Sequence, residues 1–343
     1  MITVHRVSRF YKPIFSPTFL FPSRTVENRQ MFPWIYQISR APLYTQNNTR
    51  RFIDKSQRRE KHSRIRDMKG GVKTLHALRA LIKRPISTNV PGNLIETIRN
   101  RNWQIVDRDI IERAKIVDTI LKYTEITNDH MTPDLKLFLL TPRCSLYYDS
   151  FDKIKQKLDQ VEIQTLTNPF WSIYWPGGQG LVKFIFEKQT NIFMHSKKDM
   201  NVLDLGTGCG ATAIAAKLLG IRNVMANDID KVACIATLMN ATLNGVDVQV
   251  SWDNLLDRPL EKCYDVIFIG DLLYEEELTE ILIPWLLDAA KKGTRIFLGD
   301  PGRHGLTDKL KKYLKLLRQY ELPENTRKEN NGYSDVCVWQ FIN

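Results

Sequence analysis

The chain reads VLDLGTGCG from Val202 to Gly210, an apolar run that passes directly into a turn with glycine at every second position. The next residues, Ala211 to Leu219, are rich in alanine and have helical spacing, so the stretch predicts a buried strand, a tight turn and a helix, which is half of a βαβ unit. Gly206, Gly208 and Gly210 allow positive φ and close approach to the main chain, and a helix N-terminus offers free N–H groups. Taken alone, this stretch fits an ordinary βα turn as well as a nucleoside site.

An acidic residue at the end of the next apolar run supports the nucleoside site. That run, Asn223 to Ala226, leads to Asp228, and a carboxylate there can accept both ribose hydroxyls of a cofactor. The turn of nicotinamide dehydrogenases reads G-x-G-x-x-G, whereas this one reads G-x-G-x-G with Asp204 in the strand before it. The pattern resembles motif I of the seven-strand S-adenosylmethionine (SAM) methyltransferases, and we favour SAM over NAD. The resemblance implies that Asp204 holds the methionine end of SAM; the alternative is a local turn cap.

Strands and helices continue to alternate after Asp228. We expect helices at 232–244, 278–290 and 306–317, and strands at 246–252, 264–269, 294–298 and 336–341. This order predicts a mostly parallel sheet with ligands at the carboxyl edge of its strands. With the methyltransferase resemblance, the fold class is α/β, a seven-strand Rossmann-like SAM-dependent methyltransferase domain.

Polar residues follow two further strands of the expected sheet. Asp253 and Asn254 follow the third, where this fold usually places an acceptor for the adenine amino group, although a solvated turn explains them equally well. Gly270-Asp271-Leu272-Leu273-Tyr274 follows the fourth, where methyl transfer takes place in this fold. The segment is not the Asn-Pro-Pro-Tyr of base-amine methylases, which argues against a flipped nucleobase as the acceptor. We expect Asp271 and Tyr274 to face the acceptor pocket as catalytic residues.

Positive charge is concentrated at the beginning of the chain. Residues 1–66 carry 14 Lys and Arg against 3 Asp and Glu, a net +11 of the total +12, so the remainder is near neutral and gives no electrostatic case for nucleic acid. The acid-poor segment, interleaved with Phe, Tyr, Ser, Thr and Pro, is typical of a mitochondrial presequence; a disordered basic tail is the alternative. No stretch is long and apolar enough for a membrane span.

The middle of the chain and the cysteines are less informative. Leucines at 75, 78 and 81 and apolar residues at 110–121 have helical spacing, so residues 67–118 are expected to form a helical extension of unknown role before a domain at 119–343. Apolar residues at 135–140, before Pro142, predict a helix or a strand. The five cysteines lack metal-ligand spacing, which favours a reducing compartment and no zinc site, and Cys209 is interpreted as a small filler.

Several separated motifs share a more specific resemblance. They are NPFWSIYWPGGQ at 168–179, LDLGTGCGATAIAA at 203–216, ANDID at 226–230, GDLLY at 270–274 and GDPGR at 299–303, with YTEITNDHMTP and LLTPRC between 123 and 144. Together they resemble the mitochondrial lysine methyltransferases of the electron transfer flavoprotein β-subunit, over roughly residues 119–343. That family belongs to the seven-strand protein methyltransferases related to the ribosomal protein L11 enzymes.

The family resemblance implies a function and further site residues. It implies that Trp175 lies against the cofactor, that Gly177 and Gly178 allow close approach, and that the enzyme works on a protein lysine in the mitochondrial matrix. For Arg303 and His304 we favour a structural role over contact with the protein substrate. Two other functions stay open: a SAM enzyme with another acceptor, such as ribosomal protein L11 or a small amine, and a methyltransferase-like assembly factor.

Overall fold

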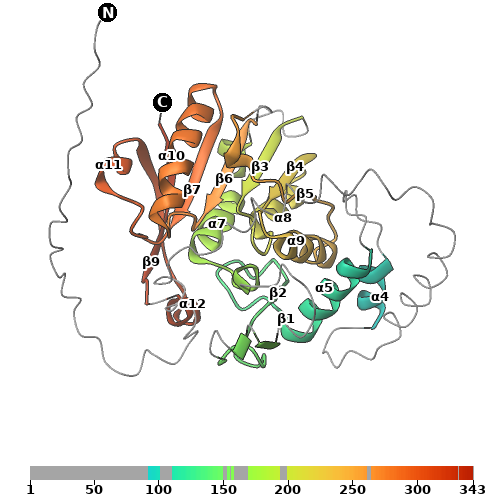
Figure 1. Ribbon diagram of the computed structural model, residues 1–343. Helices are drawn as coiled ribbons and strands as arrows, with labels where there is room; N and C mark the ends of the chain where they lie inside the picture. Colours follow the sequence, from blue (N-terminus) through green and yellow to red (C-terminus); the bar gives the residue numbers. More distant parts are fainter. Residues whose placement is uncertain are drawn as a thin grey trace, which may run out of the picture.

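The fold is built around one seven-stranded sheet. The structure is a computed structural model, and it describes residues 92–100, 110–149, 153–154, 156–157, 169–193, 199–260, 264–330 and 332–342. The strands are β3 (Asn201–Leu205), β4 (Asn223–Asn227), β5 (Gln249–Ser251), β6 (Val266–Gly270), β7 (Arg295–Asp300), β8 (Leu314–Glu321) and β9 (Asp335–Phe341). Their order is β5-β4-β3-β6-β7-β9-β8, which confirms the predicted seven-strand α/β fold (Figure 1).

Five of the strands are parallel and define one carboxyl edge. β3 pairs with β4 on one side and β6 on the other, β4 continues to β5, and β6 continues to β7. The chain therefore leaves β3 toward one half of the sheet and returns at β6 to build the other half. A crevice for ligands opens at such a reversal, outside the carboxyl ends of the strands. The glycine turn after β3 and the GDLLY segment after β6 both begin there.

Helices cover both faces of the sheet because the strands carry apolar side chains on each face. The helices of the first face are α7 (Pro176–Ile192), α8 (Ala211–Leu218) and α9 (Lys231–Leu243). The core of this face contains Val202, Val266 and Phe268. On the other face, α10 (Glu276–Lys291) and α11 (Asp308–Lys311) pack over Leu203, Ile267 and Ile269. Successive side chains of a strand point to opposite faces, so a sheet that is covered on both sides requires nearly continuous apolar runs such as that of β6.

One predicted helix is wrong. The expected helix over 306–317 ends after the single turn of α11, and its second half is the antiparallel strand β8, which pairs with β9 from Leu314 opposite Phe341. The short helix α12 (Glu324–Glu329), between these two strands, was not expected either. Lys315 and Arg318 are exposed on β8, the edge strand of the sheet, and charged residues on an edge strand protect it from further pairing.

The extension before the sheet packs onto α9. Helices α4 (Gly92–Asn100) and α5 (Ile110–Tyr123) lie beside α9, and Ile98, Ile116 and Ile120 are fully buried there (Figure 1). The predicted boundary between residues 118 and 119 lies inside α5. The division of the chain into two domains at that point remains a prediction. The predicted presequence, residues 1–66, and the leucines at 75–81 lie outside the described residues.

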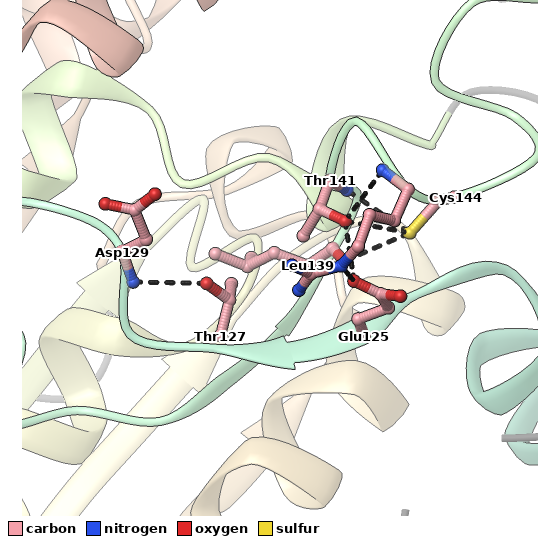
Figure 2. A network of polar contacts seen from close by, with 7 residues as sticks. Glu125, Thr127, Asp129, Leu139, Thr141 and Cys144 are labelled. Atoms are coloured by element: carbon pink, nitrogen blue, oxygen red, sulfur yellow. Dashed lines mark hydrogen bonds and ion pairs between the residues drawn. The ribbon is translucent and has the colours of Figure 1, made fainter. Parts of the chain in front are cut away.

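A small hairpin follows α5. Strands β1 (Glu125–Thr127) and β2 (Leu137–Leu139) pair antiparallel, so the apolar run at 135–140 contains a strand. Figure 2 shows the carboxylate of Glu125 beside Thr141, whose hydroxyl donates to it at 2.8 Å. The Arg143 Nε donates to the same carboxylate oxygen at 2.8 Å. These bonds tie the chain after β2 back to β1.

Candidate functional site

The glycine turn after β3 needs its three glycines for different reasons. All three have positive φ, 67° at Gly206, 53° at Gly208 and 83° at Gly210. A Cβ at Gly206 would lie 2.6 Å from Leu272, and one at Gly210 would lie 2.6 Å from Thr237, so both glycines let the turn pack against the protein. A Cβ at Gly208 would have no described heavy atom within 4 Å. Gly208 is therefore the glycine whose open side can receive a ligand.

Asp204 holds this turn in place through hydrogen bonds to it. Its side chain is buried, and one carboxylate oxygen accepts from the Thr207 hydroxyl at 2.6 Å and from the Ala213 N–H at 3.1 Å. Burial raises the pKa of Asp204 to about 6, with the hydrogen bonds acting in the opposite direction. The carboxylate thus joins the turn to the first residues of α8. A contact with the methionine end of SAM remains a prediction.

Asp228 lies at the tip of β4 and reaches the glycine turn. Its Oδ2 accepts from the Gly208 N–H at 3.0 Å, and its Oδ1 accepts from the Asp230 N–H at 3.0 Å. Burial raises the pKa of Asp228, and these backbone bonds oppose the shift. The next residue, Ile229, is 74% exposed. Sequence analysis did not single out Ile229, although an apolar residue directly after the acid was visible in ANDID.

The residues after β5 are engaged locally. Asn254 accepts from the Leu256 N–H at 3.2 Å and caps the short helix η3 (Leu255–Asp257), while Asp253 accepts from the Ser251 hydroxyl at 3.1 Å. Both side chains are exposed, so an adenine contact remains a prediction for them. Asn227, which sequence analysis did not name, organises this loop because its amide donates to the carbonyls of Ser251 and Asp253 at 2.9 and 3.0 Å.

Asp271 follows β6 and is tightly held. Within the described ranges it is the one non-glycine residue with positive φ, at 57°, a conformation that the surroundings must enforce. Its Oδ1 accepts from Arg303, at 2.8 Å from Nε and 2.6 Å from Nη2, and its Oδ2 accepts from the Gly177 N–H. Burial raises the pKa of Asp271, and the Arg303 charge opposes that shift. The structure therefore brings Gly177 and Arg303 together around the buried carboxylate of Asp271.

Gly177 and Gly178 form the first turn of α7, packed against the ends of β6 and β7. A Cβ at Gly177 would lie 2.5 Å from the Asp271 Oδ2 and 2.8 Å from the Asp271 nitrogen, and one at Gly178 would lie 3.3 Å from the Tyr174 ring. The close approach at Gly177 is thus between two parts of the protein. Contact of either glycine with the cofactor remains a prediction.

Three aromatic side chains, Phe170, Trp175 and Tyr274, form a cluster that we call the aromatic rim. The ring centroid of Phe170 lies 5.9 Å from that of Trp175 and 6.3 Å from that of Tyr274. The Trp175 Nε1 donates to the Phe170 carbonyl at 3.0 Å, and Phe170 belongs to the helical turn η2 (Pro169–Ser172). Tyr274 is 37% exposed, and burial raises its pKa to about 12, so it is a neutral phenol at physiological pH. Phe170 was quoted within NPFWS but not recognised as part of this rim.

Neither a metal centre nor a disulfide is found in the part of the chain that the structure describes. No group of His, Cys, Asp and Glu there could hold a metal ion, and Cys144, Cys209, Cys234 and Cys337 are free thiols. Cys263 lies outside the described residues. Over the same ranges, no helix combines the length and apolar character that crossing a membrane requires.

Known proteins resemble this chain over the region of the site. The profile of the Ribosomal protein L11 methyltransferase (PrmA) family matches residues 188–298, which contain the glycine turn, Asp228 and Asp271. Among solved structures, N-methyltransferase NodS from Bradyrhizobium japonicum, in complex with S-adenosyl-L-homocysteine, is 14% identical with a TM-score of 0.37, covering 55% of this chain and 97% of that one.

Two relatives match much more of the sequence. The electron transfer flavoprotein beta subunit lysine methyltransferase of Mus musculus is 39% identical over 259 residues, which are 73% of this chain and 94% of the mouse protein. The Homo sapiens protein of the same name is 36% identical over 222 residues, 64% of this chain and 79% of the human one. Because the identity to the mouse protein is 39% over 94% of its length, the chain is a methyltransferase and belongs to the electron transfer flavoprotein beta subunit lysine methyltransferase family.

Proposed function

We propose that this protein transfers methyl groups from SAM to lysine side chains of the electron transfer flavoprotein β-subunit in the mitochondrial matrix. The observation that carries the proposal is the 39% identity over 94% of the mouse relative that bears this activity in its name. The basic, acid-poor residues 1–66 support the compartment.

The residues at the carboxyl edge fit an adenosyl cofactor. Gly208 leaves open space beside the turn, and Asp228 places two acceptor oxygens at the tip of β4. Asp228 would hold the ribose, Asp253 and Asn254 the adenine, and Asp204 with the glycine turn the methionine end, next to Trp175 and the start of α7. SAM, when bound, supplies an electrophilic methyl group on a sulfonium centre.

The acceptor lysine must approach as a neutral amine. Its reference pKa near 10.4 makes deprotonation at pH 7 cost roughly 4 to 5 kcal/mol. The rim formed by Phe170, Trp175 and Tyr274 removes water from the amine, which disfavours its charged form. Tyr274 would form an aromatic wall of the acceptor pocket, and positioning, rather than acid-base chemistry, would supply most of the rate.

Asp271 is proposed to draw in and orient the amine. Its carboxylate already accepts from Arg303 and from the Gly177 N–H, and its side chain is only 5% exposed, which disfavours a direct contact with the amine. Asp271 would therefore orient the amine mainly by fixing the protein segments around it.

The direct test is methylation of purified electron transfer flavoprotein β-subunit with radiolabelled SAM, followed by identification of the modified residues. We expect label on lysine with wild-type enzyme, and at least a hundredfold less with Asp271→Ala at unchanged protein stability. Ribosomal protein L11 serves as the comparison substrate. Preferential labelling of L11 would overturn the substrate assignment, and SAM binding without transfer to any mitochondrial protein would favour an assembly factor.

A further inference from the structure

We propose that Arg303 is a positioning residue for methyl transfer, which fixes Asp271 and Trp175 relative to each other at the candidate site. The inference rests on the proposed function and deepens it. Arg303 lies in the GDPGR segment after β7, and sequence analysis favoured a purely structural role for it.

The guanidinium of Arg303 connects three separate segments. It binds the Asp271 Oδ1 through Nε and Nη2, and its side chain is only 11% exposed. Its central carbon lies 5.2 Å from the centre of the Trp175 ring and 5.7 Å from that of Tyr333. Contacts of a guanidinium with aromatic rings gain strength when water is excluded. A single side chain thus joins the loop after β6 to the residue that begins α7.

The main chain around Arg303 is fixed independently of its side chain. The Oδ1 of Asp300 accepts from the N–H groups of Gly302 and Arg303, at 2.7 and 2.8 Å, and the Asp300 side chain is fully buried. Gly302 has a φ of 99°, which turns the chain back toward the end of the sheet. The backbone that carries the Arg303 side chain is therefore fixed by hydrogen bonds, as expected for a residue that sets the position of others.

Asp271 depends on this cation. Its positive φ is unfavourable, and its Oδ2 must stay ionised and aimed at the Gly177 N–H to hold the start of α7. Removing Arg303 would leave a buried carboxylate without its counter-charge, and such a group takes up a proton instead. A protonated Asp271 would be a weaker acceptor for Gly177, so the turn beside Trp175 would lose its anchor.

The test compares Arg303→Met and Arg303→Lys with wild type, and with Arg318→Met as a matched control on the exposed strand β8. Single-turnover methylation of the flavoprotein β-subunit is measured from pH 6 to 9 at saturating SAM, with calorimetry for cofactor affinity. We expect Arg303→Met to be at least thirtyfold slower at pH 7 while cofactor affinity changes less than the rate. Arg303→Lys should recover part of the loss because it keeps the charge.

The pH profile separates positioning from a general loss of stability. The ratio of the Arg303→Met rate to the wild-type rate should rise with pH, because Asp271 becomes ionised only at higher pH in that variant. Adding Asp271→Asn to Arg303→Met should abolish this rise and, by removing the unpaired charge, also gives a variant that folds. A loss that is the same at every pH, or a rate within twofold of wild type, would overturn the proposal.

Failure of the proposed function would be recognisable separately. If wild-type enzyme leaves the flavoprotein β-subunit unmethylated, the substrate assignment is wrong. The role of Arg303 would then be judged from binding of S-adenosyl-L-homocysteine to Arg303→Met, Asp271→Asn and the double variant. The changes in affinity should be strongly non-additive, and simple additivity would overturn the coupling.

Discussion

Gly177→Ala would test the tightest contact of the candidate site. The new Cβ would lie 2.5 Å from the Asp271 Oδ2 and 2.8 Å from the Asp271 nitrogen, with the Gly299 carbonyl oxygen closer still. Two of these atoms are backbone, and the third belongs to a carboxylate held by Arg303, so none can rotate away. The start of α7 must move instead. Because overpacking of this kind typically costs 1 to 3 kcal/mol and occasionally more, we expect a loss of about 3 kcal/mol in the free energy of unfolding.

Urea denaturation of three variants would measure this loss. Gly178→Ala is the neighbouring control, because its Cβ would meet only the Tyr174 ring at 3.3 Å, and it should lose less than about 1 kcal/mol. Gly92→Ala, with no described atom within 4 Å of the new Cβ, should be neutral or gain roughly 0.4 to 1 kcal/mol. If the free energy of unfolding of Gly177→Ala lies within about 0.5 kcal/mol of the wild-type value, the description of close packing between α7 and strands β6 and β7 is wrong.

Three further experiments address the cofactor, the buried acid and the compartment. Asp228→Ala should weaken SAM binding at least tenfold in calorimetry, because each charge-assisted bond to a ribose hydroxyl contributes about 1.5 to 3 kcal/mol; unchanged affinity would remove Asp228 from the site. Asp204 has a folded-state pKa of about 6, above its ordinary value of 3.8, so its protonation stabilises the folded form as the pH falls. The stability difference between Asp204→Asn and wild type should therefore shift by about 1.4 kcal/mol in favour of wild type between pH 7 and pH 5. A fluorescent protein fused after residue 66 should enter mitochondria, and a diffuse cytosolic signal would contradict the proposed compartment.

The fold could be predicted where one periodicity dominates the sequence. The run before the glycine turn and the alanine-rich segment behind it have no competing interpretation, and β3 and α8 form within a residue or two of their predicted bounds. The segment from Leu306 to Leu317 has helical spacing but is also compatible with a strand. Its second half becomes β8 because β9 offers it a full row of backbone partners, and such tertiary pairing overrides local preference.

The residues of the candidate site could be proposed one by one from the sequence, but the contacts among them could not. Asp228 and Asp271 are proposed because each follows an apolar run, and Asp204 because it lies in the strand just before the glycine turn. The bond between Asp271 and Arg303 joins residues 32 positions apart, and it forms because β6 and β7 are neighbours in the sheet. No local pattern encodes that distance. For the same reason, Phe170 became recognisable as part of the aromatic rim only when the turn before α7 was placed beside Tyr274.

Asp228 and Asp271 differ in how many hydrogen bonds their carboxylates can still accept. A carboxylate has about four lone-pair positions, two on each oxygen. In Asp228 each oxygen accepts one backbone N–H, so each retains a position for a ribose hydroxyl. In Asp271 one oxygen already accepts two bonds from Arg303, and the other accepts the Gly177 N–H. Asp228 therefore retains a position for a ligand on each oxygen, whereas Asp271 has one oxygen fully occupied and a side chain that is only 5% exposed. This difference is the reason to expect Asp228 to contact the cofactor directly and Asp271 to act through the segments that it holds.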